Sequence, residues 1–203
     1  NSGTIQANSI QEVGGKIILT ADNITLESTS KIEAIGAKGG GEVLVGGDWQ
    51  GSNDVYQATT VTMEAGATID ASATENGDGG KVVLWSDITN ADSVTTVDGT
   101  ILAKAGAQSG DGGEIETSGY EINYDKATIN AGSKTGVGGL WLIDPAFNEI
   151  NQENANSIAA TLNGGTSVTN LVTEASGNIS VWDNVSISKT SGGNATLTLQ
   201  TPN

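Results

Sequence analysis

The segment Gly66–Trp85, GATIDASATENGDGGKVVLW, contains the pattern that the rest of the chain repeats. Ile69 and Ala71 alternate with polar residues, which is typical of a short β-strand with one buried face. A run of small and polar residues follows and ends in a Gly-Gly pair, as expected for a turn. Val82 and Leu84 then alternate again, so the pattern predicts a second strand after the turn.

The chain carries this unit repeatedly. Strand b, the strand with the Ile-x-Ala pair, is expected at Ile5/Ala7, Ile32/Ala34, Ile69/Ala71, Ile101/Ala103 and Ile129/Ala131. The Gly-Gly pairs that follow are Gly14-Gly15, Gly40-Gly41, Gly79-Gly80, Gly112-Gly113 and Gly138-Gly139. Strand c, which comes after each glycine pair, is expected at Ile17/Leu19, Val43/Val45, Val82/Leu84, Ile115/Thr117 and Leu140/Leu142. Strand a, which precedes strand b, is expected at Ile24/Leu26, Val61/Met63, Val94 (or Val97) and Ile122/Tyr124.

The spacing of these strands predicts a solenoid. The steps from strand a to strand b and from strand b to the glycine pair are nearly constant, whereas the connection from strand c to the next strand a varies. No unit can bury its apolar face alone, but stacked units bury a continuous core. A βαβ sheet would need helices between the strands, and no helical period separates them. An antiparallel sandwich would not require constant spacing. We therefore predict an all-β fold, a right-handed parallel β-helix of about seven three-stranded turns, with the hand taken from the crossover rule.

The pattern loosens after Pro145. The segment 154–162, NANSIAATL, is rich in alanine and precedes Gly164-Gly165, which predicts a short helix of about two turns inside the solenoid, with a glycine at its C-terminal end. The order of strand a, strand b, glycine pair and strand c then returns at Ile179/Val181, Val185/Ile187, Gly192-Gly193 and Leu197/Leu199.

These patterns predict one β-helix segment over residues 1–203, with regular turns over 1–145 and looser turns over 146–203. We interpret the chain as a fragment of a longer protein, because it starts and stops inside its own repeat. Strands left unpaired at the two ends of such a fragment favour end-to-end stacking.

The composition limits the classes of partner. The formal net charge is −16, and the chain has no Cys, no His and no Arg. This acidity disfavours nucleic acid, whose phosphates require cations, and anionic membrane surfaces. No apolar run reaches the roughly 18 residues that a membrane helix needs, so membrane insertion is not expected. Without Cys and His, the usual zinc ligands and the usual general base are missing, and we expect neither a metal site nor a cofactor.

Three segments of the chain resemble a known family. They are GATIDASATENGDGGKVVLWSD, GTILAKAGAQSGDGGEIETSG and VGGLWLIDP. They resemble the passenger repeats of two-partner-secretion exoproteins, which include filamentous-haemagglutinin-type adhesins and large exoproteins of haem utilisation or adhesion. The resemblance covers Gly3–Pro145 well and the remainder loosely. It implies a secreted or surface-bound rod of a Gram-negative bacterium, exported through an outer-membrane transporter by a secretion domain whose NPNGI-type and NLNG-type motifs are not found here.

The longest connection between strands, Gly46–Thr60, is the candidate for ligand contact. An exposed tryptophan with amide side chains beside it can hold a sugar by stacking and hydrogen bonding. The alternative is that the tryptophan folds back onto a small apolar cluster of the insertion itself. The candidate contact residues are Trp49, Gln50, Asn53, Asp54 and Tyr56.

Two other interpretations concern the acidic residues. A polysaccharide-active enzyme would need paired carboxylates, but Asp70, Asp78, Asp87 and Asp111 fall at corners, where aspartate serves turns. The acidic corners 75–80 and 109–113 could bind calcium, but turn formation is the favoured interpretation because neither segment matches a known calcium-loop spacing. We therefore expect an adhesive or structural rod and not an enzyme. The shaft of a contact-dependent toxin-delivery exoprotein would show the same solenoid and remains an alternative.

Overall fold

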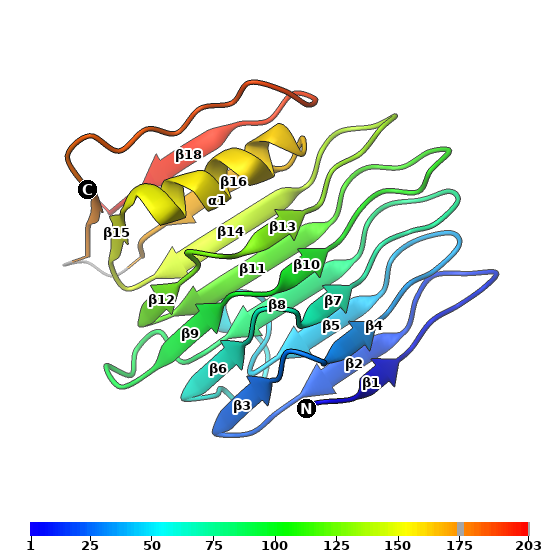
Figure 1. Cartoon of the computed structure of the whole chain (residues 1–203). Coiled ribbons are helices and arrows are strands. Elements are labelled where there is room, and N and C mark those ends of the chain that lie inside the picture. The colour runs from blue at the N-terminus through cyan, green and yellow to red at the C-terminus, as the bar shows by residue number, and fades with distance from the viewer. Residues whose placement is uncertain (174–176, 203) are drawn as a thin grey trace.

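The computed structural model describes residues 1–173 and 177–202 and confirms the predicted fold, a parallel β-solenoid of about seven turns (Figure 1). Its sheets correspond to the three predicted strand positions. The strand b sheet contains β1 (Thr4–Gln6), β4 (Lys31–Glu33), β7 (Thr68–Asp70), β10 (Thr100–Leu102) and β13 (Thr128–Asn130). The strand a sheet contains β3 (Asn23–Leu26), β6 (Thr60–Met63), β9 (Val94–Val97) and β12 (Glu121–Asn123).

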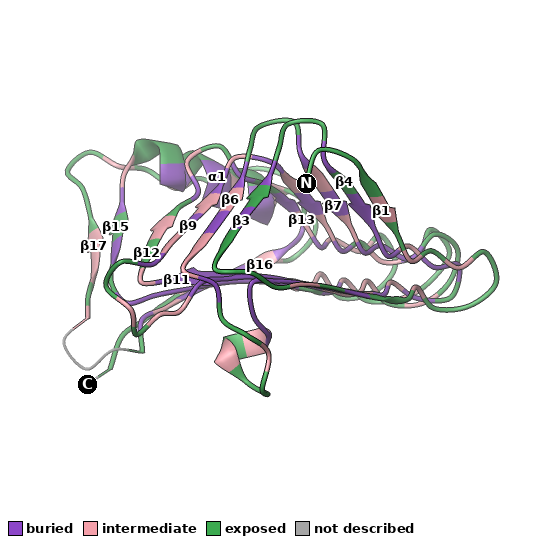
Figure 2. Ribbon diagram, turned by 90° about the horizontal axis from the view of Figure 1, so that it is seen from below, coloured by how far each residue is buried: buried purple, intermediate pink, exposed green. Residues whose placement is uncertain are grey.

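The strand c sheet is the longest and runs through the whole stack. It contains β2 (Lys16–Leu19), β5 (Glu42–Val45), β8 (Lys81–Trp85), β11 (Glu114–Gly119), β14 (Leu140–Pro145), β16 (Ser167–Leu171) and β18 (Leu197–Gln200). A short pair, β15 (Asn148–Ile150) and β17 (Ile179–Val181), continues the strand a position in the last turns. Figure 2 shows the strand c sheet nearly edge-on, as the flat base of the solenoid.

Side chains of the same type stack from turn to turn inside the core. The strand b isoleucines pair in register along the stack, and those of the second to fifth turns are buried. Outside the core, the first residues of strand c form an in-register row of alternating charge, in which Lys16 pairs with Glu42 at 2.7 Å and Lys81 with Glu114 at 3.5 Å. Because a slip of one residue would turn every side chain to the other face, the buried row fixes the register.

The prediction for strand c of the fifth turn was wrong by one residue. Ile115 pairs with Trp141 and Thr117 with Ile143, so Trp141 and Ile143 point into the core and Leu140 and Leu142 point outward. In each of the first five turns the first inward residue is the second after the glycine pair, but in the fifth turn four consecutive apolar residues hide the alternation. The Trp141 ring is fully buried and packs edge-on against Tyr124, with 5.5 Å between centroids.

The strand a alternative at Val97 is the correct one. Val97 is buried and stacks on Met63, whereas Val94 pairs with Thr60 on the outer side. The other inward position of this strand belongs to Thr95, whose hydroxyl donates to the Ser118 carbonyl oxygen at 2.8 Å. A buried threonine replaces an apolar residue here because its hydroxyl finds a partner.

The connections from strand b to strand c form flat arms that stack on one another (Figure 1). Parallel bridges such as Ser9 to Gly36 and Gly36 to Ala73 join successive arms. The Gly80 N–H donates to the Ala71 carbonyl oxygen at 2.8 Å and closes one arm, and the same bond recurs in its neighbours. A Cβ on Gly79 would lie 1.9 Å from the Ala103 carbonyl oxygen of the next turn, so only glycine fits there.

The predicted helix exists and is longer than expected. Helix α1 spans Gln152–Asn163 and lies in the strand b position of the sixth turn, against β13. Asn151 caps it by accepting from the Asn154 N–H at 2.8 Å, while the Asn154 side chain accepts from the Asn151 N–H. The sequence prediction began at residue 154 because it did not recognise this capping box. The predicted glycine follows directly, at Gly164.

The last turn lacks the strand b that was predicted at Val185/Ile187. Both side chains pack against the core, but the segment is not a strand. Its neighbour in the stack is helix α1, whose backbone bonds are used internally, so no strand edge is available. Helix side chains substitute in part: the Gln152 amide accepts from the Ser186 N–H at 3.1 Å and donates to its carbonyl oxygen at 3.2 Å.

Candidate functional site

The insertion Gly46–Thr60 leaves the solenoid between β5 and β6 and lies on the outer face of the strand c sheet (Figure 2). Gly46 begins it with a φ of +78°, and a Cβ there would lie 2.3 Å from the Trp85 carbonyl oxygen. Its N–H donates to Leu19 and its carbonyl oxygen accepts from Ala58, both within 2.9 Å. These bonds join the two ends of the insertion to each other and to β2, so the backbone conformation at its base is fixed.

Asp48 organises the tip of the insertion. It is buried and caps the short 3-10 helix η1 (Trp49–Gly51), accepting from the Trp49 N–H at 2.7 Å. Its other carboxylate oxygen accepts from Asn53 Nδ2 at 2.8 Å. Gln50 and Asn53 both have positive φ, 50° and 59°, a conformation that asparagine tolerates better than most residues. Two of the predicted contact residues, Trp49 and Asn53, are thus held by one carboxylate that the prediction did not include.

Trp49 lies over a second apolar cluster outside the main core. The cluster consists of Leu44, Val83 and Trp85, and Trp49 packs against it while remaining partly exposed. The Lys81 ammonium lies 5.2 Å from the centroid of the Trp49 ring, a cation–π distance. The Trp49 side chain is therefore partly open to solvent, as a ligand contact requires, and it packs on residues of the strand c sheet and not on an apolar cluster of the insertion itself.

Trp85 connects the insertion to the sheet beneath it. Its ring is 1% exposed, and its Nε1–H donates to Gln57 Oε1 at 3.0 Å. A Cβ on Gly47 would lie 2.4 Å from this ring, and one on Gly51 would lie 2.8 Å from it. The glycines of the insertion are therefore required by the close approach of the loop to Trp85.

Glu116 joins the insertion to a distant turn. It is a fully buried residue on the outer row of β11, where it pairs in register with Val83. Its carboxylate accepts from the Gln50 N–H and from the Ser118 hydroxyl, each at 2.9 Å. Burial raises the pKa of Glu116 to about 7, although these two hydrogen bonds favour the charged form. A carboxyl group that titrates near neutral pH thus holds the strained Gln50 backbone.

The remaining predicted residues lie apart from this cluster. Tyr56 is 54% exposed, and its hydroxyl donates to the Asp22 carboxylate from the preceding turn, which raises the pKa of the phenol. Asp54 is exposed on the insertion. The structure therefore brings Trp49, Gln50 and Asn53 together and holds Tyr56 separately. Glu116 and Trp85 were missed because they come from other turns, and only their outward position in strand c could have indicated them.

The corner aspartates have backbone partners. Asp78 accepts from the Asp111 N–H at 2.7 Å, and Asp111 in turn accepts from the Val137 N–H at 2.7 Å, so these two carboxylates join the arms of the third, fourth and fifth turns. Asp70 and Asp87 each accept at 2.9 Å from an N–H two residues further along the chain. These contacts are those of turn residues. Over residues 1–173 and 177–202, no three His, Cys, Asp or Glu side chains are grouped to hold a metal ion.

The chain matches no protein-family model, and no curated protein matches it. Among the described residues, no helix has both the length and the apolar character needed to cross a membrane.

Proposed function

We propose that the chain is a rod segment of a secreted or surface-exposed bacterial adhesin of the two-partner-secretion type. The proposal rests on the resemblance of the repeats in Gly3–Pro145 to passenger repeats of that family, together with the solenoid fold. In this proposal an outer-membrane transporter exports the whole protein through a domain outside this segment. The role of the regular turns is mechanical, because each buries its core only against its neighbours.

The insertion Gly46–Thr60 is the proposed contact surface for a glycan or protein on another cell. The observation that carries this is the placement of Trp49, a partly exposed ring on a rigid base of Leu44, Val83 and Trp85. Aromatic rings fixed in this way offer a stacking surface at little entropic cost. The enzyme alternative receives less support, since the corner carboxylates are engaged by backbone N–H groups.

The test replaces the aromatic side chains of the insertion. Trp49→Ala is expected to weaken binding to any glycan found on an array by about tenfold or more, as loss of a central aromatic contact does. Tyr56→Ala is expected to have a smaller effect, because Tyr56 lies apart from the Trp49 cluster and bonds to Asp22. Trp182→Ala is the matched control, because Trp182 is also exposed (55%) but lies outside the insertion. Circular dichroism and thermal melting check that each variant folds. Unchanged glycan binding by folded Trp49→Ala and Tyr56→Ala would remove the insertion as the contact surface.

A further inference from the structure

A pocket lies at the carboxyl ends of the strand b sheet, on a different sheet from the insertion. Its volume is about 460 Å³, within the range of about 300–1,000 Å³ that is usual for small-ligand sites. The segments after β7, β10 and β13, in three successive turns, supply most of its lining, and Ile35 and Gly164 come from the turns on either side. Ile35 and the alanines form its apolar surface. The residues with polar side chains that line it are Asp70, Ser72, Thr74, Lys104, Asn130, Ser133 and Lys134.

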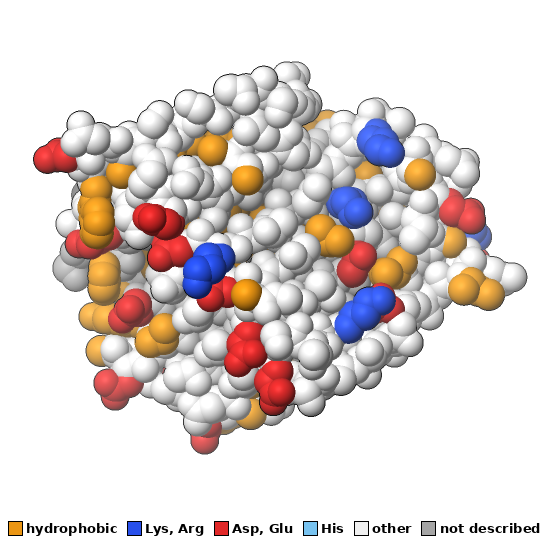
Figure 3. All heavy atoms as spheres, in the orientation of Figure 1, with side chains coloured by type: hydrophobic (Ala, Val, Ile, Leu, Met, Phe, Trp, Pro, Cys, Tyr) orange, Lys and Arg blue, Asp and Glu red, His pale blue; other side chains and the backbone are white. Residues whose placement is uncertain are grey.

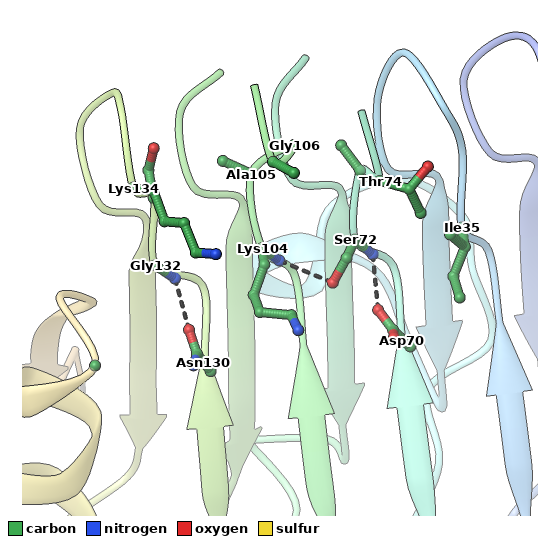
Figure 4. A pocket seen from close by; sticks show the side chains of 14 residues that line it. Ile35, Asp70, Ser72, Thr74, Lys104, Ala105, Gly106, Asn130, Gly132 and Lys134 are labelled. Carbon is green, nitrogen blue, oxygen red and sulfur yellow. Dashed lines mark hydrogen bonds between the residues drawn. The ribbon is translucent and has the colours of Figure 1, made fainter. Parts of the chain in front are cut away.

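Hydrogen bonds to the backbone hold several of these polar groups (Figure 4). Asp70 accepts from the Ser72 N–H at 2.9 Å, and the Ser72 hydroxyl oxygen accepts from the Lys104 N–H at 3.0 Å. Asn130 accepts from the Gly132 N–H at 2.8 Å. These bonds fix the polar groups before a ligand arrives, which lowers the entropic cost of binding.

The charge of the pocket is opposite to that of the protein as a whole. The chain has only eight Lys and Arg residues, against 24 Asp and Glu. Five lysines form ion pairs with carboxylates, but within the described part of the chain neither Lys104 nor Lys134 does so. Both line this pocket, from neighbouring turns, and Figure 4 shows Lys134 extended toward Lys104. Figure 3 shows that most acidic side chains on this face lie toward the strand a side, away from the arms.

From this combination we propose that the pocket binds an acidic sugar, with its carboxylate between Lys104 and Lys134. The hydroxyl and amide groups of Ser72, Thr74 and Asn130 suit the ring hydroxyls, and the Asp70 carboxylate accepts from a sugar hydroxyl. The same carboxylate disfavours a phosphate dianion, which offers no proton to donate. The proposal is independent of the insertion, because none of these residues belongs to Gly46–Thr60.

The test is a titration followed by NMR amide shifts. D-glucuronate and D-glucose form a matched pair of probes, because they differ only in a carboxylate in place of a hydroxymethyl group. D-glucuronate is expected to bind at least fivefold more tightly than D-glucose and to shift the amides of Lys104 and Gly132. N-acetylneuraminate, titrated in parallel, distinguishes a sialylated source from a uronate source, and saturable binding of either acidic sugar supports the proposal.

Charge-removing variants locate the site. Lys104→Gln and Lys134→Gln are each expected to weaken glucuronate binding at least fivefold and to leave glucose binding unchanged. Lys126→Gln is the control, because it removes the same charge from a lysine that pairs with Asp98 elsewhere. Binding of neither acidic sugar more tightly than glucose, equal losses in all three variants, or equal binding of inorganic phosphate would each overturn the proposal. These outcomes concern the pocket alone and give no result for binding at the insertion, so they are distinguishable from a failure of the proposed adhesive function.

Discussion

Replacing Gly79 with alanine is expected to destabilise the protein by about 3 kcal/mol or more. The new Cβ would lie 1.9 Å from the Ala103 carbonyl oxygen and 2.5 Å from the Gly113 nitrogen. These two atoms form a hydrogen bond of 2.8 Å that closes the next arm, so the backbone cannot move away without breaking it. Urea unfolding followed by circular dichroism measures the loss.

Gly193→Ala is the matched control for this substitution. Gly193 belongs to the last glycine pair, and a Cβ there meets no atom within 4 Å. Neither glycine has a positive φ, so the comparison isolates close packing from backbone strain. Gly193→Ala is expected to change stability by no more than about 0.5 kcal/mol. Equal losses in the two variants would contradict the view that the glycine pairs are required by contact between turns.

Replacing Glu116 with glutamine is expected to remove a pH-dependent loss of stability. The pKa of Glu116 is about 7 in the folded protein, against 4.5 for the exposed group, so the unfolded chain releases this proton first as pH rises. The contribution of Glu116 to stability is therefore fully present below about pH 4.5 and is lost as pH rises to about 7. The shift corresponds to about 3 kcal/mol.

Glutamine keeps an acceptor for the Gln50 N–H and carries no charge. Glu116→Gln is thus expected to have nearly wild-type stability at pH 5 and to exceed it by up to about 3 kcal/mol at pH 8. Urea unfolding of both proteins across this range measures the difference. Glu114→Gln is the control, since Glu114 lies on the same strand with a side chain that is 52% exposed. A stability difference that is the same at pH 5 and pH 8 would show that burial does not raise the pKa of Glu116.

The stacking of the turns could be predicted from the sequence because each repeat carries the local pattern of its own strands and turns. Ile69 and Ala71 mark a strand, and the glycines at 79 and 80 mark the point where one turn meets the next. Local alternation failed where both faces of a strand are apolar, so Trp141 was assigned to the wrong side. Alternation also failed in the last turn, where it predicted a strand at Val185/Ile187. A strand there would need a strand edge to pair with, and the adjacent element is helix α1, which has none.

The candidate site on the insertion could be predicted only in part from the sequence. Connection length identified the insertion, and residue type identified Trp49 as its main aromatic group. Its supports, Trp85 and Glu116, come from later turns, and Glu116 lies 66 residues from Gln50 in the chain. The lysine pocket was not predicted at all, since Lys104 and Lys134 become neighbours only when the turns stack. Contacts between turns therefore determine the geometry of both candidate sites.

The most direct test of the adhesive role is an adhesion assay in which one face of the rod is blocked at a time. The chain has no cysteine, so Asp54→Cys at the insertion and Glu121→Cys on strand β12 each offer a single exposed position for a polyethylene glycol label. Beads coated with the unlabelled protein are expected to adhere to host cells, with adhesion lost on labelling residue 54 and retained on labelling residue 121. Absence of adhesion by the unlabelled protein, or equal adhesion by both labelled variants, would contradict the proposal that this segment makes contact through its insertion.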